Sequence, residues 1–239
     1  MTTSAEPVRP GPLAARPVVH RPVPALPRLL RLPGVYRPQE DTALLASAIG
    51  DLAIPDGARA LDLCTGTGAQ AVTLAARGAE TVLAVDLSRR ALASVRLNAL
   101  SRGLRIHPCR GDLATAVRQG PFDVVVANPP YVPCPAPTVR ATRGWDAGGD
   151  GRAVLDPLCT AADTLLRPGG TMLIVHSALS DVDRSLTLLA TRGLRASVVR
   201  RARIPFGPVL SGRTEFLEAA GLIEPGQRVE ELVVLRADR

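Results

Sequence analysis

The chain has 239 residues, of which 46% are hydrophobic, and it contains no run of 18 uncharged apolar residues that would span a membrane. Its net charge is +7 and every basic residue is arginine, so electrostatic attraction favours acidic partners such as ribosomes, nucleic acid or acidic protein surfaces. Aromatic residues make up only 3%, which speaks against an RNA-binding module that stacks many bases. Length and composition therefore predict one α/β catalytic domain.

The cysteines and histidines form no metal-ligand pattern. The four cysteines are widely spaced without a CxxC pair, and the three histidines do not complete a zinc motif: Cys64, Cys109, Cys134, Cys159, His20, His107 and His176. We therefore expect no metal site and no disulfide, and we expect reduced cysteines in a cytoplasmic protein. For His176, at the end of an apolar strand, a buried core histidine is favoured over a catalytic base.

The first 33 residues differ from the rest. They carry eight prolines with arginines interleaved, a composition that resists both helix and sheet. We predict an extended or disordered arm over residues 1–33 and a folded domain over residues 34–239. An arginine-bearing arm would suit docking of a substrate, and an arm without function is the equal alternative.

Apolar runs and helical periodicities alternate along the folded part. The predicted strands lie near residues 59–63, 81–86, 105–110, 122–127, 171–176, 195–203 and 228–236. The predicted helices lie near residues 38–49, 68–77, 88–102, 112–119, 151–166 and 180–192. Such alternation requires right-handed crossovers and a mainly parallel sheet of Rossmann-like type, with ligands at the carboxyl ends of the strands. No lid-like insertion is expected.

The first predicted strand runs into a glycine-containing turn, Cys64-Thr65-Gly66-Thr67-Gly68, which a helical pattern follows. This is the layout of a nucleotide-binding first βα turn, in which Gly66 and Gly68 permit close approach of the backbone to a ligand. Asp62, at the strand end, is available for a cationic or donor group. The pattern is not the dinucleotide fingerprint, and ordinary strand-to-helix punctuation is the alternative.

Two acidic residues follow later predicted strands. Asp86 lies about twenty residues beyond the glycines, where a carboxylate can accept hydrogen bonds from both hydroxyls of a ribose. Asp112, after the next strand, is suited to the amino group of an adenine. The alternative for either is a helix N-cap.

The most informative motif is Asn128-Pro129-Pro130-Tyr131, directly after the apolar run of residues 122–127. Two prolines cannot continue a strand ladder, so the backbone leaves the sheet in a stiff turn. The side-chain oxygen of Asn128 and a prolyl carbonyl can accept from one planar NH2 group, and the ring of Tyr131 can stack on its face. A turn that merely ends a strand is the alternative.

These motifs, in this order, resemble those of class I S-adenosylmethionine-dependent methyltransferases of the HemK-related group, in its short form. The resemblance covers roughly residues 34–239. It includes the segment from Gly34 to Thr42, similar to a Val-Tyr-x-Pro-x-x-Asp-Thr pattern, and the stretch from Trp145 to Arg152, similar to a Gly-Gly-x-x-Gly pattern. The resemblance implies a seven-stranded sheet whose last strand is antiparallel.

The resemblance also implies the site. S-adenosylmethionine is the expected cofactor, and its expected contacts are Tyr36, Thr42, Asp62, Cys64, Thr65, Gly66, Gly68, Asp86, Leu87, Asp112, Leu113 and Asn128. Cys64 stands where the family often has glycine, and no chemical role is expected for it. Catalysis is expected from Asn128, Pro129, Pro130 and Tyr131, which would orient a substrate nitrogen for direct displacement at the methyl carbon.

The acceptor stays open among three classes. The motif suits a glutamine amide in the Gly-Gly-Gln loop of a release factor, the exocyclic amine of adenine in DNA or RNA, and an amine on a small metabolite or peptide. The folded part has no room for a target-recognition domain that would capture a flipped base, so glutamine in a protein comes first. The resemblance further implies that a small zinc-binding activator subunit is a possible partner. A non-catalytic subunit that binds the cofactor is the last alternative.

Overall fold

The computed structural model describes residues 28–135 and 145–239 of the chain. A seven-stranded sheet of order β3-β2-β1-β4-β5-β7-β6 runs through it. The strands are β1 Arg59–Leu63, β2 Thr81–Asp86, β3 Ile106–Arg110, β4 Phe122–Ala127, β5 Leu166–Ser177, β6 Arg195–Pro205 and β7 Val229–Asp238. The first five strands pair in parallel, and β7 is antiparallel to both β5 and β6. The predicted mainly parallel sheet with an antiparallel last strand is confirmed.

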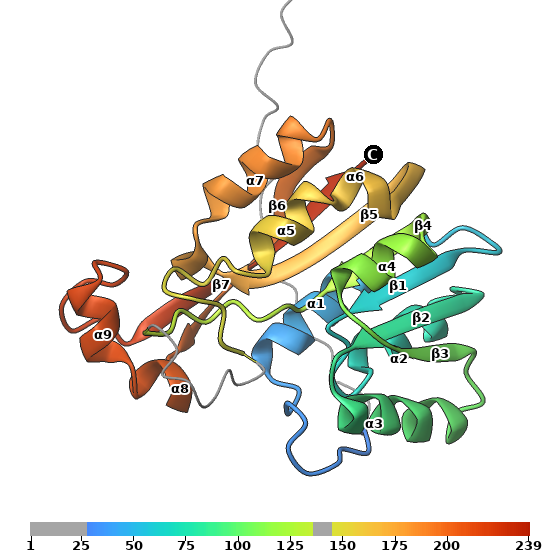
Figure 1. Ribbon diagram of the computed structural model, residues 1–239, viewed down its shortest axis with the longest axis horizontal. Helices are drawn as coiled ribbons and strands as arrows, with labels where there is room; N and C mark the ends of the chain where they lie inside the picture. Colours follow the sequence, from blue (N-terminus) through green and yellow to red (C-terminus); the bar gives the residue numbers. More distant parts are fainter. Residues whose placement is uncertain (1–27, 136–144) are drawn as a thin grey trace, which may run out of the picture.

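Helices cover both faces of this sheet (Figure 1). One face carries α1 Glu40–Gly50, α2 Ala69–Ala76 and α3 Arg89–Leu100. The opposite face carries α4 Leu113–Gln119, α5 Leu155–Thr160, α6 Ala162–Leu165 and α7 Val182–Thr191, and a short 3₁₀ helix, η1 Ala178–Ser180, follows β5. Three of the helices begin at side chains that accept from the first turn, namely Ser88 for α3, Asp112 for α4 and Asp181 for α7.

The point where the strand order reverses lies between β1 and β4. The chain runs outward from β1 to β3 and then returns to β4 on the other side of β1. Leu63 at the end of β1 pairs with Ala127 at the end of β4, so the glycine turn and the Asn-Pro-Pro-Tyr turn leave the sheet side by side. In open α/β sheets, this crevice is where ligands bind.

The core explains why the central strands read as continuous apolar runs. Residues 124–127 of β4 and residues 60–63 of β1 are all buried, because helices cover both faces of these strands. Phe122 and Leu61 are among the largest fully buried side chains. Within residues 28–135 and 145–239, no helix combines the length and apolarity needed to cross a membrane.

Some boundaries differ from those predicted. The helix expected over residues 151–166 is two short helices, α5 and α6, which meet at Ala161, and β5 begins earlier than expected, at Leu166. The register between β4 and β5 shifts after Phe122, near Gly169 and Gly170. Proline and glycine were read as the end of a helix, whereas here they form an irregularity inside a longer strand.

Two helices were not predicted at all. Between β6 and β7 the chain forms α8 Pro208–Ser211 and α9 Thr214–Ala219, with a small core of their own around Leu210 and Leu217. Figure 1 shows these helices beyond the end of the sheet at which β5 terminates. The sequence did not reveal this insertion, because each helix is too short to produce a readable periodicity.

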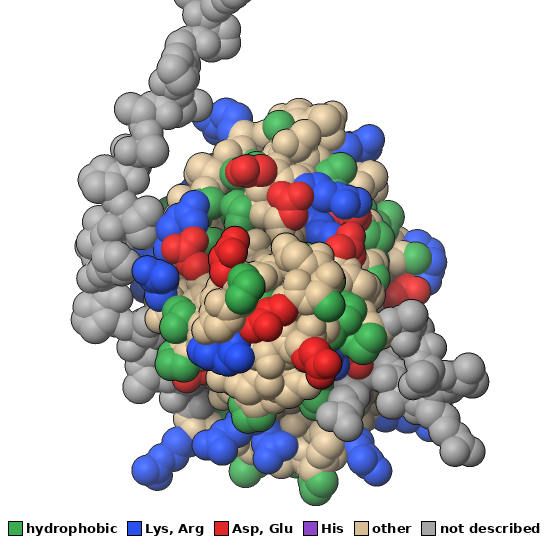
Figure 2. Space-filling view, turned by 90° about the vertical axis from the view of Figure 1, so that its left-hand side faces the viewer, with side chains coloured by type: hydrophobic (Ala, Val, Ile, Leu, Met, Phe, Trp, Pro, Cys, Tyr) green, Lys and Arg blue, Asp and Glu red, His purple; other side chains and the backbone are tan. Residues whose placement is uncertain are grey.

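Charges of both signs mix on the surface at this end. Figure 2 views the molecule from the side of α8 and α9 and shows carboxylates and arginines interspersed among the described residues. Part of the predicted N-terminal arm is also described: the backbones of Leu30 and Leu32 bond to the side chains of Asn98 and Ser94 on α3. Residues 1–27 lie outside the described residues, and the boundary at residue 33 stays a prediction.

Candidate active site

The glycine turn after β1 has the open geometry expected of a ligand-binding turn. Gly66 and Gly68 have positive φ angles of 55° and 83°. A Cβ atom added at Gly66 would meet no atom within 4 Å, so the space over the turn is open, whereas one at Gly68 would meet Val95 Cγ2 at 3.1 Å. Gly66 thus leaves room for a ligand, and Gly68 allows close packing on α3.

Asp62 braces this turn from below. Its Oδ2 atom accepts hydrogen bonds from Thr65 Oγ1 at 2.5 Å and from the amide of Ala71 at 2.9 Å, and the residue is only 1% exposed. Burial raises the pKa of Asp62 to about 7 even though both hydrogen bonds lower it. The side chain therefore ties the turn to the first turn of α2, in addition to any contact with a ligand.

Asp86 lies at the edge of the same turn. Its Oδ2 accepts from the amide of Gly66 at 2.9 Å and its Oδ1 accepts from the amide of Ser88 at 2.8 Å. The next residue, Leu87, is 68% exposed, which places an apolar side chain beside a carboxylate at the rim of the crevice. A carboxylate can accept hydrogen bonds from the sugar hydroxyls of a nucleoside, and an exposed apolar side chain beside it can contact the base.

Asp112 serves as the N-cap of α4. Its Oδ1 accepts from the amide and the hydroxyl of Thr115 at 3.0 and 3.1 Å, which holds the pKa of Asp112 below its ordinary value. A Cβ at the preceding Gly111 would lie 2.4 Å from Thr115, so only glycine permits this approach. The carboxylate remains exposed. With Asp86 and the open turn at Gly66, these residues fit an adenosyl group along the carboxyl ends of β1, β2 and β3.

Cys64 has a left-handed backbone. Its φ angle is 60°, a conformation that costs a side-chain-bearing residue energy and glycine none. This accounts physically for glycine at the corresponding family position. Burial raises the pKa of the Cys64 thiol to about 12, and the charges of Asp86 and Asp62 raise it further in the same direction. The thiol is therefore protonated and inert at neutral pH.

The Asn-Pro-Pro-Tyr turn is tied to a buried carboxylate that lies in the Val-Tyr-x-Pro-x-x-Asp-Thr pattern but was not among the expected site residues. Asp41, near the start of α1, is 4% exposed. Its Oδ2 accepts from Asn128 Nδ2 at 3.0 Å, from Tyr36 Oη at 3.0 Å and from Tyr131 Oη at 3.3 Å. In the sequence, Asp41 belongs to the family pattern at the start of the helix predicted over residues 38–49, and nothing there indicates its bonds to Asn128 and Tyr131.

The two tyrosines and Thr42 complete this cluster. Thr42 donates from its amide and its hydroxyl to Asp41 Oδ1, at 2.5 and 3.0 Å. Burial raises the pKa of Tyr36 and of Tyr131 above the ordinary value, and the neighbouring Asp41 raises both further. Both hydroxyls are therefore donors at neutral pH. The structure brings Tyr36, Thr42, Asn128 and Tyr131 together around Asp41.

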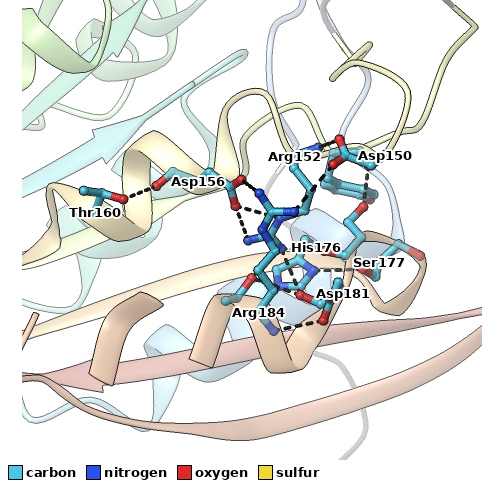
Figure 3. Close-up of polar contacts among 11 residues, drawn as sticks. Asp150, Arg152, Asp156, Thr160, His176, Ser177, Asp181 and Arg184 are labelled. Carbon is cyan, nitrogen blue, oxygen red and sulfur yellow. Dashed lines mark hydrogen bonds and ion pairs between the residues drawn. The ribbon is translucent and has the colours of Figure 1, made fainter. Parts of the chain in front are cut away.

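A buried arginine, Arg152, lies at the centre of a cluster of polar contacts with Asp156 and Asp181 (Figure 3). Arg152, 2% exposed, bonds to the carbonyls of Ser180 and Asp181 and to Ser185 Oγ, and forms an ion pair with Asp156 at 2.6 Å. Ser180 Oγ in turn donates to the carbonyl of Tyr131 at 2.7 Å. The Gly-Gly-x-x-Gly stretch therefore fixes the backbone of the catalytic turn.

Gly151 and His176 belong to the same support. A Cβ added at Gly151, where φ is 75°, would lie 2.3 Å from the carbonyl oxygen of Tyr131. His176 is fully buried, with Nδ1 2.8 Å from the carbonyl of Ser177 and Nε2 3.2 Å from Ser185 Oγ. Burial lowers its pKa to about 4. His176 is thus the buried core histidine that the sequence favoured.

The unpredicted α8–α9 segment packs onto the chain that continues from the catalytic turn. Arg213, between the two helices, donates to the carbonyl of Pro133 at 2.9 Å and pairs with Asp146 at 2.5 Å. Asp146 and Trp145 belong to the stretch in which the resemblance was seen, and the carbonyl of Trp145 accepts from the amide of Val132. The segment therefore packs against Val132 and Pro133, the two residues that follow Tyr131.

A second buried carboxylate lies nearby. Glu230, at the start of β7, is 7% exposed and also escaped the sequence analysis. Burial raises its pKa to about 6, with Asp41 and Glu40 adding to the rise and a hydrogen bond from Ser177 opposing it. The four cysteines are free thiols, and no group of metal-binding side chains occurs within residues 28–135 and 145–239.

Three curated relatives resemble the chain over most of its length. One from Methanocaldococcus jannaschii, assigned provisionally as a protein N5-glutamine methyltransferase, is 30% identical over 73% of this chain and 88% of its own. The release factor glutamine methyltransferase of Deinococcus radiodurans is 37% identical over 77% of this chain and 66% of its own. A 4-amino-L-phenylalanine/4-methylamino-L-phenylalanine methyltransferase of Streptomyces pristinaespiralis is 36% identical over 61% of this chain and 55% of its own. The chain thus spans just under two thirds of the length of the Deinococcus enzyme.

Solved structures agree with the fold. A chain of the E. cuniculi Mtq2-Trm112 complex, described as responsible for methylation of the eRF1 translation termination factor, superposes with a TM-score of 0.61 and 26% identity, over 86% of this chain and 99% of its own. The T. thermophilus 16S rRNA N2 G1207 methyltransferase, solved with AdoMet and guanosine, has a TM-score of 0.58 and 22% identity, over 92% of this chain and 52% of its own. The methyltransferase small domain family matches residues 28–191. The chain belongs to this family and is a class I S-adenosylmethionine-dependent methyltransferase.

Proposed function

We propose that the chain methylates the side-chain amide nitrogen of a glutamine in a protein, with peptide-chain release factors as the first substrate class. The observation that carries this proposal is the state of Asn128, whose Nδ2 is held by Asp41 so that Oδ1 remains to accept from an incoming NH2 group. The names of the relatives from Deinococcus and E. cuniculi support the choice of a release factor.

S-adenosylmethionine, when bound, supplies a methyl group on a positively charged sulfur. An amide nitrogen is a weak nucleophile because its lone pair is delocalised into the carbonyl, so the chain must orient it. In our proposal Asn128 Oδ1 and the carbonyl of Pro129 accept its two N–H groups, which aims the nitrogen and stabilises positive charge as it develops there. Pro130 stiffens the turn, and the ring of Tyr131 packs on the amide plane. The extra proton is released after transfer, so no strong base is required beforehand.

The remaining predicted residues hold the cofactor in this proposal. Asp86 accepts from the ribose hydroxyls, while Leu87, Asp112 and Leu113 surround the adenine. The turn at residues 62–68 and the pair of Tyr36 and Thr42 lie along the methionine end. These roles rest on the open space over Gly66 and on the exposed Leu87 beside Asp86.

A small amine is the second candidate acceptor. The Streptomyces relative, by its name, methylates an aromatic amine on an amino acid. In this chain α8 and α9 pack against the residues that follow the catalytic turn, a position that would suit enclosure of a small acceptor. Nucleic acid is the weaker alternative, because the face beside α8 and α9 mixes both charges instead of presenting a basic surface (Figure 2).

A small activator subunit belongs to the same proposal. The E. cuniculi relative was solved as an Mtq2-Trm112 complex, and this chain covers 99% of the chain of that complex on which it superposes. A cytoplasmic location follows if the substrate is a release factor, because the enzyme must meet its substrate where proteins are translated.

The test is transfer of radiolabelled methyl from S-adenosylmethionine to purified release factor, with 4-amino-L-phenylalanine, total RNA and DNA as parallel acceptors. We expect label on the release factor that disappears when its Gly-Gly-Gln glutamine is replaced. Asn128→Ala should lower transfer about 100- to 1000-fold, the usual loss for one oriented group in a polarised site. Label on 4-amino-L-phenylalanine or nucleic acid alone would contradict the glutamine assignment.

A further inference from the structure

We propose that Asp41 is a positioning residue that determines which end of the Asn128 amide faces the methyl acceptor. This inference rests on the proposed function, because it concerns how an NH2 group is received. The carboxamide of asparagine has an acceptor end and a donor end of nearly the same shape. Only the oxygen end can accept from an acceptor NH2, so a rotation of Asn128 by half a turn would set donor against donor.

Geometry makes Asp41 the residue that selects the orientation. Asn128 Nδ2 lies 3.0 Å from Asp41 Oδ2, across 87 residues of sequence. The same oxygen receives the hydroxyls of Tyr36 and Tyr131, and Oδ1 is taken by Thr42. All the neighbours of the Asp41 carboxylate are hydrogen-bond donors, so the carboxylate acts as an acceptor. The amide of Asn128 must therefore point its NH2 group toward Asp41.

The carboxylate of Asp41 is held in place by burial and hydrogen bonds, so it can favour one orientation of the Asn128 amide. Asp41 is 4% exposed and accepts five hydrogen bonds in total. A hydrogen bond between an amide and a charged group contributes about twice as much as one between neutral groups. The reversed amide would bring its oxygen against this carboxylate, so one orientation is strongly preferred. The N-terminal segment thereby acts on the catalytic turn without touching the acceptor.

The first test requires no acceptor. The sequence contains two asparagines, Asn98 and Asn128, so selective ¹⁵N-asparagine labelling yields two side-chain NH2 pairs. Asn98 Nδ2 donates to the carbonyls of Leu30 and Thr67 and serves as the internal control. In Asp41→Ser, which removes the carboxylate without adding a third asparagine, we expect the Asn128 pair to shift and exchange with water at least tenfold faster, while the Asn98 pair stays in place. An Asn128 pair that does not change would overturn the inference.

The second test exchanges the two side chains. Asp41→Asn should lower kcat about 100-fold and change the KM for S-adenosylmethionine much less, because Asp41 supports Tyr36 and Thr42 at the methionine end but orients the only amide proposed to receive the acceptor. Asn128→Asp sets two carboxylates side by side and should be at least as inactive. The double variant places an amide at residue 41 and a carboxylate at residue 128, so that a donor again faces an acceptor and an oxygen again faces the substrate.

We expect the double variant to recover to within about tenfold of the wild type, a strong coupling between neighbours. A purely structural role for Asp41 predicts instead that the two losses multiply, and this result would overturn the inference. Kinetics use whichever acceptor the wild type labels. If the wild type fails to label any release factor, the proposed function fails, while the amide spectra still decide the role of Asp41.

Discussion

The cofactor side and the acceptor side of the site are built in different ways. On the cofactor side, the acidic residues sit where strands end, and two of them are held by near neighbours, Asp112 by Thr115 and Asp62 by Thr65. On the acceptor side, Asn128 and Tyr131 bond to the buried carboxylate of Asp41, which is distant in sequence, and the chain that follows the turn bonds to Arg213 through the carbonyl of Pro133. Local turns suffice to bind a ligand, whereas orientation of a weak nucleophile requires a scaffold drawn from the whole fold.

The largest disruption of the acceptor side is expected from Gly151→Ala. The added methyl group would lie 2.3 Å from the carbonyl oxygen of Tyr131, at a backbone angle unfavourable to alanine. We expect a loss of about 3 kcal/mol in the free energy of unfolding and near-complete loss of methyl transfer. Urea unfolding and the transfer assay measure both effects.

Gly149→Ala is the matched control, because a Cβ at Gly149 meets nothing within 4 Å. It should stay within about 0.5 kcal/mol of the wild type. If Gly151→Ala lost no more unfolding free energy than Gly149→Ala, the residues that contact Tyr131 could adapt to the added methyl group. That result would weaken the contrast between the acceptor side and the cofactor side.

The cofactor side of the site could be predicted from the sequence more fully than the acceptor side. Each strand end on the cofactor side could be located, because apolar runs, glycine and acidic residues are close in sequence and each signal is local. Asn128 and Tyr131 were found through the stiff Pro-Pro turn. Asp41, Arg152 and Arg213 could not be given their roles, because an acidic or basic residue reads as a surface charge until tertiary contacts bury it. The α8–α9 segment was missed because helices of four and six residues are too short to show a hydrophobic periodicity.

The pH dependence of stability should report on the acceptor side. Burial lowers the pKa of His176 to about 4, below the ordinary value of 6.5. The folded state therefore binds fewer protons than the unfolded state between these values, so this stability is fully present above pH 6.5 and is lost as pH falls toward 4. The loss should reach about 3 kcal/mol, and urea unfolding at several pH values measures it.

His176→Gln should remove most of this slope, because a neutral amide has no proton to gain. His107→Gln is the control, since His107 is exposed on β3. An unchanged slope in His176→Gln would assign the acid sensitivity to another group.

A weaker effect is expected where α8 and α9 meet the catalytic turn. Arg213→Ala removes an ion pair with a mostly buried Asp146 and a hydrogen bond to Pro133. We expect the KM for the acceptor to rise about tenfold and cofactor affinity to stay unchanged, because the variant loosens only the contact between the α8–α9 segment and the residues after the turn. Steady-state kinetics measure the KM for the acceptor, and titration measures the affinity for S-adenosylmethionine. Arg228→Ala, which removes a more exposed pair with Glu218, should alter neither. A parallel loss of cofactor affinity in Arg213→Ala would contradict the division.

The smallest effect is expected on the cofactor side, at Cys64. Its φ angle of 60° is strained for cysteine and natural for glycine, but glycine also gains freedom in the unfolded chain, so the two effects partly cancel. We expect Cys64→Gly to raise the free energy of unfolding by less than about 1 kcal/mol and to leave cofactor affinity unchanged. Cys64→Ala keeps the strain and loses only the thiol, so it should be less stable than Cys64→Gly. If alanine proves the better replacement, the packing of the thiol outweighs the backbone strain. The cofactor turn would then depend on its surroundings in the way that the acceptor turn does.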